Sequence, residues 1–364
     1  MPYGQILADT HKDSLNYVLA PSSSVMRNRI INGAMVIDQR NAGASVTNAA
    51  TTAYTLDRFQ YYASQASKFT IQQNAGSVTP PAGFSNYVGI TSLSAYTPSA
   101  SEQFIFGQMI EGFNTADLQF GTSNAKTVTL SFWVRSSLTG TFGASLINSA
   151  YNRSYPFSYT ISSANTWQQI SVTIAGDTTG TWIGSTNGVG IRLYFSLGCG
   201  STSQGTANAW VAAEKETVTG ETQIVGTSGA TFYITGVQLE VGLNATGFEY
   251  RQYGTELALC QRYYETYQAG YVTGANYSTS ASQGFMMKFN VTKRATPTMA
   301  IVSGSATVTN AAAGNAGGTV AINVQPNSPS NGGDLAVSGA SGLVAGNAGA
   351  LISSTLILSY SAEL

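Results

Sequence analysis

The residue types that usually carry enzyme chemistry are few in this sequence, and they are not grouped. The single histidine, His11, has no serine or aspartate pattern around it, so a nucleophile activated by a histidine base is not expected. No cysteine and histidine residues have the spacing of a zinc site. No phosphate-binding or dinucleotide-binding glycine pattern follows an expected strand. The sequence therefore predicts no catalytic residue, no metal site and no cofactor.

Glycoside hydrolysis needs only carboxylates, so the composition leaves it open. It uses two acidic side chains that face a sugar cleft. The repeated turns of a parallel β-helix, the usual body of a polysaccharide-degrading spike, are absent from the sequence. We therefore expect a protein that is not an enzyme. The acids that could pair in the folded chain include Asp38, Asp57, Asp117, Asp177 and Glu214.

Aromatic residues beside small polar residues favour a different chemistry, the binding of sugars. An aromatic ring can stack on the face of a sugar, while a few placed polar side chains hold its hydroxyl groups. Tyr151, Trp182 and Trp210 are each flanked by Gly, Ser, Thr or Asn, which makes them the candidate glycan-binding residues. Trp133 and Trp167 have strand-like contexts and are expected to be packing residues.

The composition describes a chain that is polar but almost uncharged. Of its 364 residues 43% are apolar and only 9% are charged, where roughly 25% is typical. Its 16 lysines and arginines are too few and too dispersed to bind nucleic acid. Segment 342–360 is apolar but is interrupted by Gly and Asn, so no membrane insertion is expected. Cys199 and Cys260 are too few for a disulfide framework and are expected to be buried thiols.

Apolar and polar residues alternate from about residue 28 to residue 253. That period of two is typical of strands with one buried face. Turn clusters, and no helix-length segments, separate the strands, which favours an antiparallel all-β fold. At this length a jelly-roll β-sandwich over residues 28–253 fits best. The expected strands include 126–137, 157–161, 167–174, 190–198 and 231–242.

A short segment after residue 253 has the spacing of an amphipathic helix. Thr255 can serve as its N-cap, and Glu256 is favourably placed in its first turn. The apolar residues that follow have spacings of three, four and three, which predicts one apolar face of a linking helix over residues 254–268. We expect this face to close the sandwich or to pack against other copies of the chain. The candidate oligomer-interface residues are Leu257, Cys260, Tyr264 and Tyr267.

Two further regions complete the expected organisation. Residues 1–27 are short, mixed in composition and interrupted by a Pro-Ser stretch, so we expect an N-terminal anchoring arm. Residues 269–364 resume the strand pattern and predict a smaller β-sandwich that forms a tip. Its loops around 310–318 and 327–333 are rich in Gly and Asn and are candidate receptor contacts.

Several segments resemble virion structural proteins of tailed bacteriophages, which are commonly described as tail-fibre or fibre-like proteins. They are NRIINGAMVIDQRNAG (28–43), AKTVTLSFWVRSSLTGTFG (125–143), TFYITGVQLEVGLNATGFEYRQYGTELALCQRYYE (231–265) and KRATPTM (293–299). The resemblance covers most of residues 28–300. It implies a carbohydrate-binding-module-like jelly roll, a homotrimer, and a place at the virion surface with a role in host attachment.

The resemblance leaves the part of the virion open. The short arm favours a short tail fibre that recognises a host cell-surface glycan, with the arm bound to other virion proteins of the tail, baseplate or capsid. A head fibre or a capsid-decoration protein is the first alternative, and a polysaccharide-degrading spike is the second. In each case we expect synthesis in the cytoplasm of the host bacterium and function on the virion.

Overall fold

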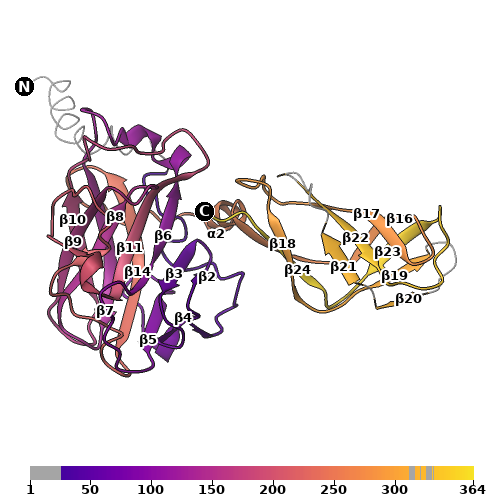
Figure 1. The fold of residues 1–364 in the computed structure, drawn as a ribbon, viewed down its shortest axis with the longest axis horizontal. Helices are drawn as coiled ribbons and strands as arrows, with labels where there is room; N and C mark the ends of the chain where they lie inside the picture. The colour runs from indigo at the N-terminus through magenta and orange to yellow at the C-terminus, as the bar shows by residue number, and fades with distance from the viewer. Residues whose placement is uncertain (1–25, 311–315, 320, 325–329, 331) are drawn as a thin grey trace, which may run out of the picture. The chain divides into compact units, whose positions relative to one another are not determined.

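The computed structural model describes residues 26–364 except 311–315, 320, 325–329 and 331 (Figure 1). Among these residues the regular structure is almost entirely β, and α2 (Tyr253–Gln261) is the single α-helix. No helix in this part of the chain is long and apolar enough to span a membrane. Most of the expected arm, residues 1–25, lies outside the described residues.

The chain divides into two compact units. The first runs through Val36 and also includes Thr47–Ala53 and Tyr61–Arg251. The second includes Ile37–Val46, Tyr54–Gln60 and Gln252–Leu364. Two short segments of the N-terminal half therefore group with the C-terminal half, whereas the sequence pattern placed them in the first domain.

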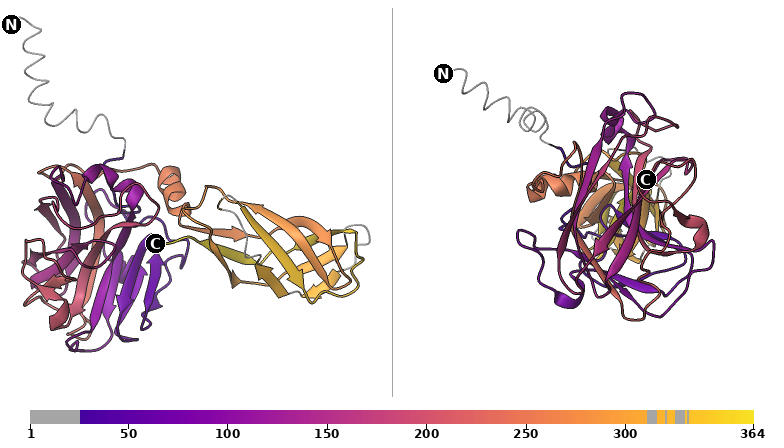
Figure 2. Two further views of the ribbon diagram at one scale, coloured as in Figure 1. Left: turned by 45° about the horizontal axis from the view of Figure 1, so that its top comes forward. Right: turned by 90° about the vertical axis from the view of Figure 1, so that its left-hand side faces the viewer.

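Two six-stranded sheets make up the jelly-roll sandwich (Figures 1 and 2). One has the order β1 (Val46–Thr47), β4 (Phe69–Gln73), β5 (Val88–Ser92), β14 (Thr231–Val241), β7 (Val128–Ser136), β10 (Gln168–Ile174). The other has the order β2 (Thr52–Leu56), β3 (Phe59–Ala63), β6 (Gln103–Glu111), β11 (Val189–Cys199), β8 (Gly140–Ile147), β9 (Ser154–Ile161). Pairings such as β7–β10, β6–β11 and β8–β9 are antiparallel, so the predicted all-β jelly roll is confirmed.

Aromatic side chains from both sheets meet in the core of the first unit. Phe132 of β7 is fully buried, and its ring centroid lies 5.0 Å from that of Phe195 on β11 and 5.1 Å from that of Tyr159 on β9. Phe142 of β8 similarly approaches Phe232 of β14 at 6.3 Å. Edge-to-face ring pairs, such as the two that Phe132 makes, add about 0.5–1.5 kcal/mol beyond the area that they bury. The alternating apolar residues of the strands thus become the contact between two layers.

Short elements at the ends of the strands carry the loops of the first unit. The 3-10 turns are η1 (Ala75–Ser77), η2 (Gly112–Asn114), η3 (Ala116–Leu118) and η4 (Ser201–Ser203). Two short parallel strands, β12 (Gln204–Gly205) and β13 (Thr217–Val218), lie outside the two main sheets. After β14 the chain packs back on this unit, because Phe248 contacts Phe84 at 5.1 Å between centroids and Glu249 accepts hydrogen bonds from the amides of Arg27 and Asn28.

The second unit is a smaller β-sandwich, as predicted. One sheet has the order β15 (Tyr264–Gln268), β24 (Ile357–Ser361), β18 (Thr298–Ser303). The other has the order β20 (Ala316–Thr319), β19 (Thr307–Asn310), β23 (Ala348–Ile352), β16 (Tyr271–Asn276), β17 (Ala281–Lys288), β22 (Gly332–Ser338), β21 (Ala321–Val324). Leu358 and Tyr360 of β24 share a buried core with Phe285 and Met287 of β17, and the Tyr360 hydroxyl donates to Met287 Sδ at 3.4 Å.

The helix that follows the first unit is shorter than its spacing predicted. It ends at Gln261, and Gln252 rather than Thr255 stands at its N-cap. Tyr264 and Tyr267 lie on β15, where Tyr264 pairs with Ser361 of β24. Tyr and Thr residues are common in strands, and the available partner strand decides the outcome.

The candidate interface residues consequently do not form one helical face. Cys260 and Tyr264 are buried within the chain itself, and Tyr267 packs partly against the core of the second unit. Leu257 is half-buried on α2. Their part in an oligomer stays a prediction, but the buried residues among them are not accessible to a second copy of the chain. Both cysteines are buried free thiols, as expected.

Candidate functional site

The structure brings two of the three candidate aromatic residues into one cluster. Trp182, in the loop between β10 and β11, lies 5.4 Å from Trp210, in the loop between β12 and β13, at an angle of 83° between the ring planes. Phe120, which follows η3, contacts both rings at 5.0 and 5.8 Å. Tyr155 of β9 completes the cluster at 5.1 Å from Trp210. Three separate loops and one strand therefore converge at this end of the first unit.

A buried ion pair fixes the orientation of Trp182. Its Nε1 donates to Asp177 Oδ2 at 3.1 Å, and Arg153 holds the same carboxylate through Nε and Nη2 at 2.8 and 2.6 Å. Burial alone would raise the pKa of Asp177, but the hydrogen bonds from Arg153, Thr179 and Trp182 outweigh it and lower the pKa below its usual value. This bidentate geometry is the strong form of the arginine–carboxylate interaction. The indole ring is thus held in place before any ligand binds.

Gly121 allows the two loops to approach each other. It has a φ of 84°, and its N–H donates to the Asp177 carbonyl at 2.7 Å. A Cβ at this position would lie 2.7 Å from the Gly180 carbonyl oxygen and 3.3 Å from the Trp182 ring. A larger residue would therefore push the Trp182 loop away from Phe120.

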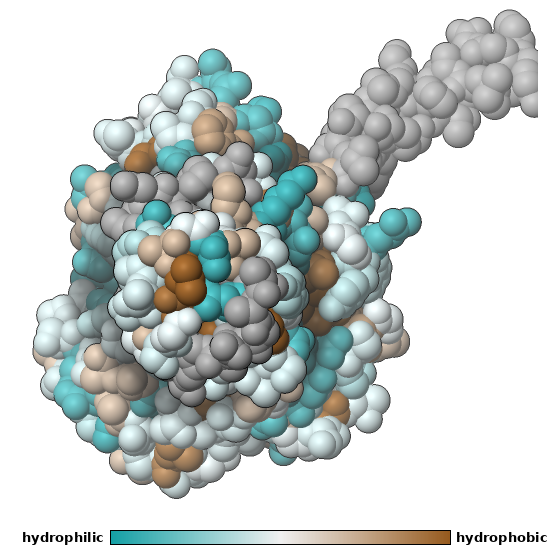
Figure 3. Space-filling model, turned by 90° about the vertical axis from the view of Figure 1, so that its right-hand side faces the viewer, coloured by the Kyte–Doolittle hydropathy of each residue, from teal (hydrophilic) through white to brown (hydrophobic). Residues whose placement is uncertain are grey.

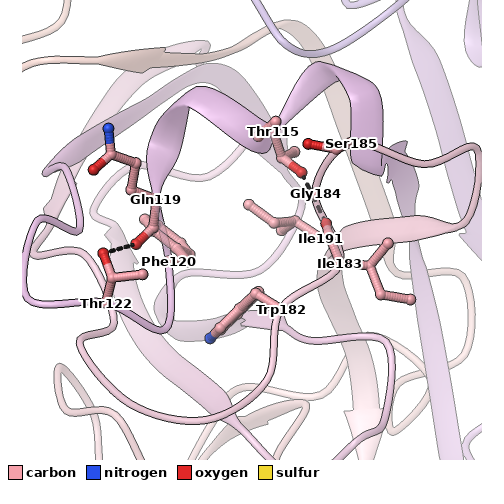
Figure 4. A pocket seen from close by; sticks show the side chains of 10 residues that line it. Thr115, Gln119, Phe120, Thr122, Trp182, Ile183, Gly184, Ser185 and Ile191 are labelled. Carbon is pink, nitrogen blue, oxygen red and sulfur yellow. Dashed lines mark hydrogen bonds between the residues drawn. The ribbon is translucent and has the colours of Figure 1, made fainter.

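A groove of about 300 Å³ lies beside this cluster (Figure 4). One wall comes from the segment after β6 and the other from the loop that leads into β11. The lining combines rings and aliphatic side chains with hydroxyl and amide groups, and no lining residue is charged. The lining residues are Thr115, Ala116, Gln119, Phe120, Thr122, Trp182, Ile183, Gly184, Ser185 and Ile191.

Two polar groups on the rim are free to bind a ligand. The hydroxyl of Thr115 donates to the Gly112 carbonyl at 3.2 Å, and the hydroxyl of Thr122 donates to the Gln119 carbonyl at 2.8 Å. The side chains of Gln119 and Ser185 make no hydrogen bond to another residue in the described part of the chain. Figure 4 shows them on opposite sides of the groove.

The same two residues have unusual backbone conformations. Gln119 and Ser185 both have a φ of 55°, in the left-handed region that ordinary residues avoid. Such a conformation costs of order 1–3 kcal/mol and is concentrated at functional sites. Each of the two loops thus adopts a strained backbone conformation at the residue whose free polar side chain lines the groove.

Tyr151, the third candidate, lies next to this region but does not line the groove. Its ring stacks on the Arg192 guanidinium at 3.9 Å, and Arg192 donates to the Asn148 carbonyl at 2.8 Å. The Asn148 amide donates to the Thr181 carbonyl at 3.0 Å, which joins this loop to the residue before Trp182. Tyr151 is therefore part of the support of the Trp182 loop.

The candidate tip loops of the second unit fall mainly outside the described residues. Residues 316–318 belong to β20 and 332–333 to β22. The side chain of Asn310 is buried, with Oδ1 accepting from Asn276 Nδ2 at 2.7 Å and from the Val344 amide at 3.1 Å. On the face that Figure 3 displays, hydrophobic surface occurs as separate brown areas among white and teal. The exposed apolar side chains of the second unit include Tyr271, Tyr277, Met286, Ile301 and Val344.

Comparison with known proteins adds a general likeness of fold. No protein-family model matches the sequence, and no curated protein matches it. Similar solved structures include a putative sugar-binding protein from Bacteroides thetaiotaomicron, with 12% identity and a TM-score of 0.33 over 59% of this chain and all of that one. The family 11 carbohydrate-binding module from Clostridium thermocellum, in complex with a mixed-linked tetrasaccharide, has 9% identity and a TM-score of 0.28 over 56% of this chain and 100% of that one.

A third similar structure is the enzymatically active domain of tailspike protein 4 of bacteriophage CBA120. It has 12% identity and a TM-score of 0.31, over 60% of this chain and 22% of that one. The chain thus matches less than a quarter of the tailspike structure. At these identities and scores the three likenesses concern the β-sandwich architecture alone.

Proposed function

We propose that this chain is a virion structural protein of a tailed bacteriophage, which attaches the particle to its host by binding a surface glycan. The observation that carries the binding role is the uncharged groove, in which a fixed tryptophan lies between two free polar side chains. The virion assignment rests on the resemblance of segments 28–43, 125–143 and 231–265 to fibre-like proteins.

The groove suits a neutral sugar. A sugar ring that stacks on Trp182 replaces water on an apolar face, while the Gln119 amide and the Ser185 hydroxyl can exchange hydrogen bonds with its hydroxyl groups. Each such hydrogen bond contributes about 0.5–1.5 kcal/mol net. An acidic sugar would find no cation in the lining to neutralise it. The expected ligand is therefore a neutral hexose unit of a surface polysaccharide.

Weak single-site binding fits a multivalent assembly. One stacked ring and two or three hydrogen bonds correspond to a Kd on the order of 1 mM, or about −4 kcal/mol. Linked copies raise the apparent affinity by a factor of about 10²–10⁴ without any new contact. A homotrimeric short tail fibre, repeated around a virion, would supply those copies. The arm, residues 1–27, would bind the other virion proteins.

Two alternatives have different tests. A head fibre or capsid-decoration protein would share these folds, and deletion of residues 1–27 would then detach the protein from the capsid instead of the tail. A polysaccharide-degrading spike would need two facing carboxylates, and the groove lining contains none. Release of reducing ends from host capsule or lipopolysaccharide by the purified protein would establish the spike.

The direct test measures glycan binding by variants of the groove. Trp182→Ala should weaken binding to a host polysaccharide at least about tenfold, since a lost ring stack costs roughly 1.4 kcal/mol or more. Gln119→Ala removes an exposed side chain and should weaken binding severalfold without affecting the fold. The matched control is Trp167→Ala, because the Trp167 indole bonds to the Thr79 carbonyl and lies outside the groove lining.

The possible results of this test have different consequences for the proposed binding site. Binding to host glycan that survives both groove substitutions would place the receptor site elsewhere. A wild-type protein that binds no neutral glycan of its host would overturn the glycan-binding role. A melting curve for each variant separates loss of binding from loss of fold.

A further inference from the structure

One phenylalanine of the first unit is exposed to solvent. Phe113 is 57% exposed, whereas the other phenylalanines of the 15 in the chain, all of which the structure describes, are buried or half-buried. Full burial of such a side chain contributes about 1.5–3 kcal/mol, and Phe113 forgoes much of this. Single apolar residues are common on protein surfaces, so the position of Phe113 in the fold decides whether its ring has a role.

Phe113 lies on η2, directly beside one end of the groove. Thr115, two residues later, lines the groove on the wall that follows β6. The Phe113 N–H donates to the Thr186 carbonyl at 2.8 Å, and Thr186 directly follows Ser185, which lines the opposite wall. Thr115 and Ser185 mark the end of the groove that lies away from Gln119 (Figure 4). The backbone of Phe113 therefore adjoins both walls at that end.

Close backbone contacts hold η2 against the loop that leads into β11. The Gly112 N–H donates to the Gly188 carbonyl at 2.8 Å, and the Thr115 hydroxyl lies 3.4 Å from the Ile183 carbonyl. A Cβ on Gly190 would lie only 2.9 Å from the Gly112 Cα, so glycine at position 190 permits this approach. The exposed ring therefore stands on a fixed base, and a ligand that binds it need not order the protein first.

An uncharged amide without a partner lies next to this ring. Arg29 fixes the backbone of the segment, because its Nη1 donates to the Asn114 carbonyl at 3.2 Å and its Nη2 to Asp117 Oδ2 at 2.7 Å. The half-buried Asn114 side chain makes no hydrogen bond to another residue within the described ranges. It can therefore exchange hydrogen bonds with the hydroxyl groups of a ligand that lies on Phe113.

The region thus repeats one combination of groups at two places. Within the groove, the Trp182 ring accompanies the free amide of Gln119. Beside the far end, the Phe113 ring accompanies the free amide of Asn114. An apolar face with a few polar groups that fix orientation is the usual composition of a binding site. A single sugar can lie on one of these rings, whereas a chain of sugars can lie on both.

We propose that Phe113 is a second stacking platform, and that the site binds a stretch of two or more consecutive neutral sugar units. This inference rests on the glycan-binding function proposed for the groove. Trp182 holds one unit, and Phe113 holds another unit of the same chain beyond Ser185, with the Asn114 amide beside it. The ligand class is therefore an oligosaccharide stretch of a surface polysaccharide, and a single sugar fills only part of the site.

The second platform makes the affinity depend on the length of the glycan. A monosaccharide gains nothing from Phe113 while it lies on Trp182. A longer chain contacts both rings, and we expect it to bind about tenfold more tightly, which corresponds to about 1.4 kcal/mol. The gain should appear once the chain is long enough to reach from one ring to the other and should then level off.

The test titrates the full chain with sugars of one to about six units, prepared by partial acid hydrolysis of the host's neutral surface polysaccharide. Phe113→Ala should abolish the gain with chain length and leave monosaccharide binding unchanged, whereas Trp182→Ala should weaken binding at every length. Phe113→Tyr, which keeps an aromatic ring, should retain the gain. The matched control is Tyr271→Ala, an exposed aromatic residue of the second unit, which is 63% exposed and should change nothing.

The results distinguish a failure of this inference from a failure of the proposed function. Equal affinity of the wild type for all lengths, or a gain with length that survives in Phe113→Ala, would overturn the second platform and leave glycan binding by the groove intact. A wild type that binds none of these sugars would overturn the glycan-binding function, and the second platform with it. A melting curve for Phe113→Ala confirms that the exposed ring is not needed for the fold.

Discussion

Buried acids are neutralised in two different ways in this protein, and the first unit shows both, because its Asp177 is paired with Arg153. In the second unit Lys293 Nζ lies 2.5 Å from Glu265 Oε2, and Glu363 pairs with both Arg40 and Arg58. In the first unit the buried Glu216 has neither a basic partner nor a hydrogen bond of ordinary geometry. An acid with a fixed basic partner keeps its charge over a wide pH range, whereas an acid without one changes its charge with pH.

The ion pairs of the second unit also join segments that are far apart in the sequence. Arg58 is 1% exposed and stacks on Tyr263 at 3.6 Å, and its partner Glu363 is the penultimate residue. The Tyr54 hydroxyl donates to the carbonyl of Leu364 at 3.1 Å. These contacts explain why residues 54–60 belong to the C-terminal unit. Asp57 is the exception to the comparison, because burial raises its pKa to about 6 even though Arg40 and hydrogen bonds from Gln39 oppose the rise.

The largest expected effect comes from breaking a buried pair in the second unit. Lys293→Met leaves Glu265 buried and uncompensated, which should destabilise that unit by about 3–5 kcal/mol. All four tryptophans lie in the first unit, so their fluorescence reports its unfolding and hydrogen exchange in residues 263–364 reports that of the second. The control is Lys293→Met with Glu265→Gln, which removes the stranded charge and should recover most of the loss. Equal protection in the single variant and the wild type would contradict the comparison.

A smaller effect is expected from pH in the first unit. Burial raises the pKa of Glu216 to about 8 and that of Glu221 to about 7, above their unfolded values. The folded chain therefore holds protons that the unfolded chain has released, and its stability falls as pH rises from about 5 to about 8. Each pH unit in that window is worth up to about 1.4 kcal/mol per group, and relaxation and water penetration reduce the total to a few kcal/mol.

Denaturant curves at pH 6 and pH 8.5, followed by tryptophan fluorescence, would measure this loss. Glu221→Gln should flatten the pH dependence, because a neutral amide has no proton to lose. A first unit that becomes more stable over this range would show that these two acids are not protonated in the folded chain.

The smallest effect on stability is expected for an ion pair on the protein surface. Arg29 and Asp117 form an ion pair at 2.7 Å on the surface of the first unit, where the Asp117 side chain is 47% exposed. Asp117→Asn should change the stability of that unit by no more than about 0.5 kcal/mol, because water already solvates the charges. A loss comparable with that of Lys293→Met would mean that burial is not what distinguishes the pairs.

Local sequence patterns were enough to predict the class of fold and part of the site. Alternation of apolar residues is a local property, so segments such as 126–137 and 231–242 could be predicted as strands from their own residues. The small polar neighbours of Trp182 and Trp210 were a sufficient signal for a ring on a loop, and the two rings do lie together. Nothing near them in the sequence pointed to Phe120, Gln119 or Ser185.

Contacts between residues far apart in the sequence determine which loops meet and which short segments become strands. Phe120 and Trp182 are 62 residues apart and approach because β6 and β11, the strands next to their loops, are hydrogen-bonded neighbours. Tyr264–Gln268 has helical spacing to its preceding residues, yet it pairs with Ile357–Ser361. A five-residue segment gains too little from its own hydrogen bonds to fix its state, so the distant strand that pairs with it determines the outcome. Whether a buried acid such as Glu216 or Glu265 has a basic side chain as its partner likewise depends on residues brought near by the fold.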